Sequence, residues 1–505
     1  MTKQGLLLLC AAASVPQYLP GQALSFPWSG YGHDSQHTAL SSVPAQPLNR
    51  IRWQTPVDLQ PQYSGTSLLV HYGAPLVTAA NTVIIPVKTG ATNGFKVEAR
   101  SGADGSLKYS LTSDYTLPPH NWMPSFGPVV SARNRLYYAG AGGTVYYRDQ
   151  PDSSTGPTGQ IAFYGNANYA SNPAVYDSMI KISTPITSDR TGNIFFGYRV
   201  LGANPLNLQS GVAKIAYNGV GTFVTALAAA GGDASITKVA MNCAPALSND
   251  HRILYFGVSS TGSFGVGYLA AVDSRTMAPI ARVRLKDPRA TNDAFLSENG
   301  SSSPTVGPDG DVFYGVLENP FPQHHARGWL LHFNGALTQT KIPASFGWDI
   351  TPSIVPSTLV ANYSGPSAYL ILTKYNNYAG AGGDGVNKVA VLDPGVAMTD
   401  AYSSVQVMNE VFTLAGPTPD SQYVANFPGA VREWCINTTA IDPFTKAAFA
   451  NNEDGRLYRI DFAARAITES ITLTLGIGEA YTPTVIGVDG TVYAINNAIL
   501  FAVGQ

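Results

Sequence analysis

The fold is decided by the stretch Tyr481-Thr482-Pro483-Thr484-Val485-Ile486-Gly487-Val488-Asp489-Gly490-Thr491-Val492-Tyr493-Ala494-Ile495-Asn496. The residues up to Ile486 predict a short strand that begins at a proline, and Asp489-Gly490 predicts a tight turn. Alternating Val, Tyr and Ile residues after the turn predict a second strand. The same order of proline, short apolar run, turn and apolar strand occurs several times upstream, so the chain is built from a repeat.

The repeat occurs eight times along the 505 residues. Its copies start at Pro75, Pro128, Pro185, Pro245, Pro304, Pro352, Thr439 and Pro483, with threonine in place of proline in one copy. A repeat array forms one structure however long it is, so the chain length does not imply several domains. Each copy has room for four strands. The sequence therefore predicts an all-β protein, an eight-bladed β-propeller of four-stranded antiparallel blades.

The last copy ends after three strands, the third at 499–503. We expect residues 51–57 to supply its missing outer strand, which would close the ring and remove both free sheet edges. An open solenoid is the alternative, but it predicts capping repeats that the sequence does not show. The propeller domain would then span 24–505, with an outer strand at 337–340 in blade five and a long insertion at 374–427 in blade six.

Composition excludes several classes of function. A net charge of −2 with 12% charged residues provides no basic surface for nucleic acid or for an anionic membrane. Lys3, the apolar run from Gly5 to Ala13 and the small residues at 21–23 predict a signal peptide over residues 1–23. A cytosolic protein with a disordered or buried N-terminus is the alternative. We expect a monomer that is secreted or periplasmic and has no transmembrane segment.

Two cysteines remain after the predicted cleavage, Cys243 and Cys435. They begin blades four and seven, which lie across the ring from each other. We expect their Cα atoms to be too far apart for a disulfide bond.

The residues just before each inner strand of a propeller crowd around one mouth of the central channel. Charged residues are scarce in this chain, yet many fall at these positions. Our catalytic candidates there are Asp349, His120, Glu433 and Tyr481. The candidates for ligand binding are Trp122, Asn242, Trp348, Arg432, Trp434 and Lys181. The candidate metal ligands are Glu298, Asn299 and Glu479. Polar residues that merely line a water-filled channel are the alternative explanation.

These residue types fit more than one chemistry. The carboxylates offer hard oxygen ligands for Ca²⁺, with help from Asn299 or Asn437. Carboxylates that lie close together also raise one another's pKa, which would provide a general acid and a general base. His120 beside Trp122 suggests a sugar subsite. Salt bridges from the carboxylates to Arg432 and Lys181 are the structural alternative.

The N-terminal segment Trp28-Ser29-Gly30-Tyr31-Gly32-His33-Asp34 precedes a strand that contains Trp53. This opening resembles that of quinoprotein-like β-propellers, in which Trp-x-x-x-Gly-x-Asp stands before a strand that bears tryptophan. The resemblance implies a dehydrogenase that oxidises an alcohol or sugar with pyrroloquinoline quinone and Ca²⁺. It places the catalytic aspartate at Asp349, and Ca²⁺ ligands at Glu298 or Glu479 with Asn299. The adjacent-cysteine pair of these enzymes is missing, and the chain is short for them.

Two further functions remain open. A polysaccharide lyase or hydrolase would use His120, Tyr481, Lys181 or Arg432 with the carboxylates, while aromatic side chains stack on sugar rings. A non-catalytic exported propeller would bind a glycan, a small molecule or an envelope protein at the channel mouth. It resembles the outer-membrane-assembly lipoproteins, which keep the quinoprotein fold without the cofactor.

We favour this last function, although the sequence does not decide whether the protein is an enzyme. The distinction depends on whether Asp349, Glu298 and Glu479 converge on one point or each find a separate partner.

Overall fold

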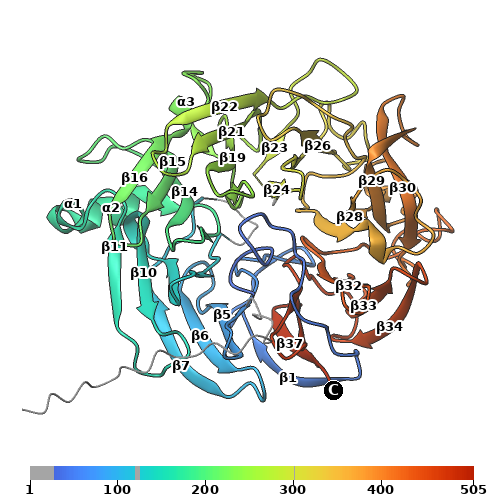
Figure 1. Cartoon of the computed structure of the whole chain (residues 1–505), viewed down its shortest axis with the longest axis horizontal. Helices are drawn as coiled ribbons and strands as arrows, with labels where there is room; N and C mark the ends of the chain where they lie inside the picture. Colours follow the sequence, from blue (N-terminus) through green and yellow to red (C-terminus); the bar gives the residue numbers. More distant parts are fainter. Residues whose placement is uncertain (1–27, 120–124, 299, 301) are drawn as a thin grey trace, which may run out of the picture.

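The computed structural model describes residues 28–119, 125–298, 300 and 302–505. Eight antiparallel sheets are arranged as blades around a common axis, as Figure 1 shows in a view along that axis. The predicted eight-bladed all-β propeller is therefore confirmed. The predicted signal peptide lies outside the described residues.

Blade one shows why these residues form this fold. Its strands are β4 (Leu76–Val77), β5 (Thr82–Lys88), β6 (Phe95–Ser101) and β7 (Leu107–Ser113). Every residue of β5 is buried, whereas β7 has no buried residue and alternates between exposed and partly exposed positions. The apolar inner strands thus pack between neighbouring blades, and the outer strands face solvent.

The following blades repeat this plan. Blade two contains β8 (Val129–Val130), β9 (Arg135–Ala139), β10 (Thr144–Asp149) and β11 (Thr158–Ala162). Blade three contains β12 (Ile180–Ile182), β13 (Thr187–Ser188), β14 (Ile194–Val200), β15 (Gly211–Ile215) and β16 (Gly221–Thr225). Blade four contains β17 (Lys238–Val239), β18 (Ala246–Leu247), β19 (Ile253–Ser259), β21 (Gly267–Asp273) and β22 (Pro279–Arg284).

The second half of the ring is more varied. Blade five contains β24 (Thr305–Val306), β25 (Val312–Val316) and β26 (Trp329–Phe333). Blade six contains β27 (Ser353–Pro356), β28 (Tyr369–Tyr375), β29 (Lys388–Thr399) and β30 (Gln406–Ala415). Blade seven contains β31 (Ala440–Asp442), β32 (Ala447–Asn451), β33 (Arg456–Asp461) and β34 (Ala466–Thr472).

Blade eight contains β35 (Val485–Ile486), β36 (Val492–Asn496), β37 (Ile499–Gly504) and, from the other end of the chain, β1 (Arg50–Pro56). Two small strand pairs are separate from the blade sheets: β2 (Tyr63–Ser64) with β3 (Ser67–Leu68), and β20 (Phe264–Gly265) with β23 (Leu296–Ser297). The helices are short: α1 (Asn166–Ser171), α2 (Pro173–Met179), α3 (Ala226–Ala229) and the 3₁₀ turns η1 (Ala141–Gly143), η2 (Ser357–Leu359) and η3 (Ala379–Ala381).

The ring is closed as predicted. Strand β1 pairs antiparallel with β37, from Arg50 opposite Gly504 to Pro56 opposite Ile499. Figure 1 shows the blue β1 beside the red β37. Just after β1, the carboxylate of Asp58 accepts a hydrogen bond of 2.8 Å from the Lys88 ammonium, and neither side chain is exposed. This ion pair links the end of β1 to blade one.

The segment 28–41 lies in the centre of the ring, where it is drawn in blue in Figure 1. Its backbone carbonyl groups accept hydrogen bonds of 2.7–3.0 Å from the inner strands of six blades. The donors are the amides of Val77, Val130, Leu247, Val306, Ile354 and Ile441. Each donor lies on the inner strand of its blade. The segment therefore fills the centre of the ring, and the hydroxyl of Tyr31 lies 2.8 Å from that of Thr351, just before β27.

Blades five and six depart from the sequence-based expectation. Blade five has three regular strands, and the predicted outer strand at 337–340 makes a single bridge, Phe333 with Thr340. In blade six, the stretch 374–427 contains β29 and β30, which are the blade's own third and fourth strands. The true insertion in blade six is therefore shorter than the predicted one at 374–427.

Cys243 and Cys435 are both buried free thiols, which confirms that they do not pair. Within the described ranges, no helix is long and apolar enough to cross a membrane.

Candidate functional site

Charged side chains from blades six, seven and eight gather around one lysine at the predicted channel mouth. The lysine is Lys374, near the end of β28, and its ammonium lies 2.6 Å from Oδ2 of Asp349, just before β27. Asp349 is 3% exposed and Lys374 is 2% exposed. This ion pair is therefore almost completely removed from water. We call Asp349, Lys374, Glu433, Glu453 and Glu479 the Lys374 cluster.

Glu433 and Glu453 come from blade seven, before β31 and after β32. The backbone amide of Glu453 donates a 2.9 Å hydrogen bond to the carbonyl of Glu433, which holds the two residues together. Burial, together with the neighbouring charge of Glu453, raises the pKa of Glu433 to about 8. Burial also raises the pKa of Glu453. The site thus holds carboxyl groups that retain protons at pH values where exposed glutamates are ionised.

Glu479, just before β35, is partly exposed and contacts the thiol of Cys435. The Sγ of Cys435 donates a 3.1 Å hydrogen bond to Oε2 of Glu479. Burial, followed by the charge of Glu453, raises the pKa of Glu479 to about 7. Burial raises the pKa of the Cys435 thiol well above its usual range, so this group stays a neutral donor.

Aromatic rings surround the lysine. Its ammonium lies 5.1 Å from the ring centroid of Tyr481 and 5.7 Å from that of Phe346. The hydroxyl of Tyr481 donates a 3.1 Å hydrogen bond to the backbone carbonyl of Asp349. Tyr481 also has a φ of 21°, a backbone conformation that side-chain-bearing residues rarely adopt. Strain of this kind is often found at binding sites and active sites.

Arg432 belongs to the edge of the cluster. Its guanidinium lies 3.2 Å from Asp420 and 3.8 Å from Glu453. Arg432 thus forms ion pairs with two carboxylates that were not among the predicted ones.

A second charged group lies between blades three and five. Glu298 forms ion pairs with Lys238 and, at 3.8 Å, with Arg199. Burial, with the positive charge of Arg199, lowers the pKa of Lys238 to about 8. Glu298 is therefore paired with Lys238 and Arg199 and is not part of the Lys374 cluster.

The other predicted residues have separate surroundings. The ammonium of Lys181 donates a 2.6 Å hydrogen bond to the carbonyl of Asp177, in α2. Trp434 has no exposed surface and packs on Tyr458, with ring centroids 5.6 Å apart, so its ring offers no face to a ligand. Trp348 packs on the core between blades five and six, and Asn242 is 2% exposed. His120, Trp122 and Asn299 lie outside the described residues.

The arrangement bears on Ca²⁺ binding. Among the described residues, no group of three or more His, Cys, Asp or Glu side chains is placed to hold a metal ion. Glu298 is neutralised by two cations, and Glu479 already accepts a hydrogen bond from a thiol. Ca²⁺ takes about six to eight oxygen ligands, carboxylates among them, that converge on one point. The described donors therefore do not fit the Ca²⁺ site that the quinoprotein resemblance implies.

Sequence reasoning missed Lys374 and Glu453. Both lie at the end of a second strand, whereas the prediction considered positions before the inner strands. Lys374 had a visible signal, because it is the one charged residue in the apolar run Tyr369–Tyr375. Glu453 had no such signal, because it lies in a turn where charged residues are common.

No protein-family model and no curated protein matches this chain in sequence. Solved structures are similar in shape. A europium-containing methanol dehydrogenase is 9% identical, with a TM-score of 0.55, over 93% of this chain and 89% of its own. Sqt1 of Saccharomyces cerevisiae is 10% identical, with a TM-score of 0.50, over 89% of this chain and 100% of its own. A quinohemoprotein alcohol dehydrogenase from Comamonas testosteroni is 10% identical, with a TM-score of 0.49, over 95% and 77%.

At this level of identity the likeness shows the fold alone. The predicted resemblance to quinoprotein-like propellers is therefore confirmed for the fold, and the activity has to be argued from the site.

Proposed function

We propose that the protein is an exported, non-catalytic propeller that binds a small ligand with a cationic group at the Lys374 cluster. One observation carries this proposal. The three carboxylates that a quinoprotein-type enzyme would bring to one point have separate partners. Asp349 is paired with Lys374, Glu298 with Lys238, and Glu479 with the thiol of Cys435.

The preference for a cation follows from the charges. The Lys374 cluster contains four carboxyl groups and one ammonium group, with Arg432 at its edge. Burial and mutual repulsion raise the pKa of Glu433 to about 8 and that of Glu479 to about 7. A cationic group placed beside these carboxyls would favour their ionised form and would be attracted strongly in a partly buried site. The rings of Tyr481 and Phe346 add surfaces on which a cation can lie.

The export part of the proposal rests on the sequence of residues 1–23.

The alternative function, a quinone-dependent dehydrogenase, requires Asp349 to act as a base. Its pairing with a buried lysine at 2.6 Å opposes that role, because the ion pair would have to be broken first.

Thermal-shift titration of the purified protein tests the proposal. The cationic probes are putrescine and choline, and glucose is the neutral comparison. A ligand that binds only the folded state raises Tm, so we expect a rise with at least one cationic probe and none with glucose. The rise should disappear in the double variant Glu433→Gln/Glu479→Gln and persist in Glu298→Gln, which removes a carboxylate outside the cluster. The proposal would be overturned if no cationic probe raised Tm. It would also be overturned if the double variant showed the same rise in Tm as the unaltered protein.

A further inference from the structure

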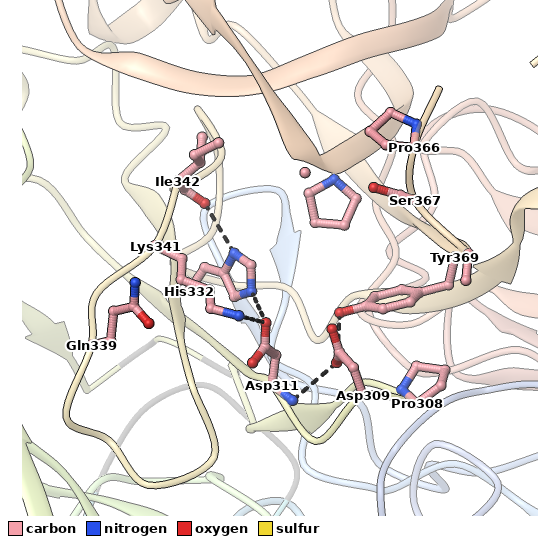
Figure 2. A pocket seen from close by; sticks show the side chains of 13 residues that line it. Pro308, Asp309, Asp311, His332, Gln339, Lys341, Ile342, Pro366, Ser367 and Tyr369 are labelled. Atoms are coloured by element: carbon pink, nitrogen blue, oxygen red, sulfur yellow. Dashed lines mark hydrogen bonds and ion pairs between the residues drawn. The ribbon is translucent and has the colours of Figure 1, made fainter. Parts of the chain in front are cut away.

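A pocket of about 720 Å³ lies between blades five and six, on the face opposite the Lys374 cluster. Its floor is the turn 308–311, which follows inner strand β24, whereas Asp349, Glu433 and Glu479 precede their inner strands. Figure 2 shows Gln339, Lys341 and Ile342 on one side of the pocket and Pro366, Ser367 and Tyr369 on the other. Its volume is in the range of known small-molecule sites.

The pocket exists because both blades are irregular here. Blade five lacks a regular fourth strand, and the segment 339–344 takes its place with isolated contacts. The carbonyl of Pro343 accepts a 2.8 Å hydrogen bond from the amide of Met408, so this segment reaches across to β30 of blade six. In blade six, the pairing of β29 with β30 shifts register between Asp393 and Ala397. Such bulges commonly lie beside functional sites.

The walls of the pocket combine flat apolar surfaces with hydrogen-bonding groups. Its apolar surfaces come from Pro308, Ile342, Pro366, Ala368 and Pro394, with the ring of Tyr369. Its polar groups are Asp309, Asp311, His332, Gln339, Lys341 and Ser367. The pocket therefore offers hydrogen-bond donors and acceptors beside apolar surfaces.

The charged groups of the pocket are bound to other protein groups. Asp311, which is 6% exposed, accepts a 2.9 Å hydrogen bond from Nε2 of His332 and also pairs with the ammonium of Lys341. Nδ1 of His332 faces the carbonyl of Ile342 at 3.3 Å. Both ring nitrogens of His332 thus lie beside oxygen atoms of the protein. Asp309 accepts a 2.9 Å hydrogen bond from the hydroxyl of Tyr369.

Asp309 and Asp311 thus each have a protein partner, so the pocket presents no isolated charge. A strongly charged ligand would disturb these pairs. A neutral ligand with many hydroxyl groups would not, because each hydroxyl can donate to a carboxylate and accept from an ammonium or amide. Carboxylate oxygens accept more than one hydrogen bond, so Asp309 and Asp311 retain capacity for a ligand.

We propose that this pocket binds a neutral saccharide. The sugar C–H faces would lie on the prolines and Ile342, and its hydroxyls would bond to Asp309, Gln339, Lys341 and Ser367. This site is separate from the Lys374 cluster and does not depend on the function proposed for it.

The test is a microarray of neutral and anionic oligosaccharides probed with the full chain, followed by calorimetric titration of the strongest neutral binder. Ala368→Trp fills the pocket from an exposed wall position without removing a hydrogen bond, and we expect it to weaken binding at least about tenfold, as loss of one or two good contacts would. Gln339→Ala removes one exposed amide and should weaken binding by about three- to tenfold.

The matched control is Ser364→Trp, which adds the same bulk to an exposed position of the same loop outside the pocket. This control should bind the oligosaccharide like the unaltered protein. All three variants should show the same Tm response to putrescine and choline as the unaltered protein. Unchanged binding by both Ala368→Trp and Gln339→Ala would overturn the proposal. Binding of anionic glycans alone, or of no glycan, would overturn it as well.

Discussion

Blade eight and blade five begin alike and end differently. Both start with a two-residue inner strand that is wholly buried, β35 in one and β24 in the other. Blade eight gains a regular outer strand from the distant N-terminus, with pairing along the whole of β1. Blade five stops at three strands, and an irregular segment covers its edge. The complete blade closes the ring, and the incomplete one leaves a pocket. In this propeller, regular strands provide stability and departures from them provide room for a ligand.

The largest expected effect concerns the ion pair that fastens β1 to blade one. Lys88→Met leaves the carboxylate of Asp58 buried without its partner, so we expect the free energy of unfolding to fall by about 3–5 kcal/mol. Urea denaturation measures this change. The matched variant in blade five is Lys341→Met. Lys341 is one-third exposed and Asp311 keeps His332 as a partner, so the expected loss is about 1 kcal/mol or less.

Equal losses of unfolding free energy in Lys88→Met and Lys341→Met would contradict the comparison between the two blades. They would mean that the irregular edge of blade five stabilises the protein as much as the closure of the ring does.

An intermediate effect is expected at the Lys374 cluster, where charge rather than strand pairing sets the stability. The pKa of Glu433 is about 8 in the folded protein, above its ordinary value of 4.5. A raised pKa means that the folded state binds the proton more tightly, so this contribution is complete below about pH 4.5 and is lost as the pH rises through about 8. We therefore expect Tm to fall between about pH 5 and pH 9.

Glu433→Gln should flatten this fall, and at about pH 9 the variant should be more stable than the unaltered protein. Thermal unfolding at a series of pH values measures both quantities. A Glu433→Gln profile parallel to that of the unaltered protein would show that this carboxyl does not carry the pH dependence.

The smallest effect is expected on the outer edge of blade five. The side chain of Thr338 is exposed and bonds to Asn334 within one turn. Thr338→Ala should therefore change the free energy of unfolding by less than about 0.5 kcal/mol, as is usual for surface positions. A loss above about 2 kcal/mol, in the range of buried substitutions, would show that this edge is part of the stabilising framework.

The sequence predicted most of the fold because every blade begins with the same short apolar strand and turn. It did not predict the end of blade five. Pro343 has no amide hydrogen to continue a ladder with β26, and its carbonyl bonds to Met408 of blade six instead. The pattern of 337–340 is compatible with a strand, but the next residues turn toward the neighbouring blade.

The site was predicted in part for the same reason. Asp349, Glu433, Glu479 and Tyr481 lie before inner strands, so their common register brought them together. Which groups pair could not be inferred from that register, because the partners Lys374 and Glu453 come from second strands. Pairing depends on side-chain reach across blades, and a repeat alignment does not contain that information.

We propose that the carboxylates of this propeller serve binding rather than quinone chemistry. The most direct test of this proposal is reconstitution with pyrroloquinoline quinone and Ca²⁺, gel filtration to remove free cofactor, and measurement of quinone absorbance in the protein fraction. We predict no retained quinone, because Asp349, Glu298 and Glu479 have separate partners. Retention of about one quinone per chain that requires Ca²⁺ and disappears in Asp349→Ala would contradict the account.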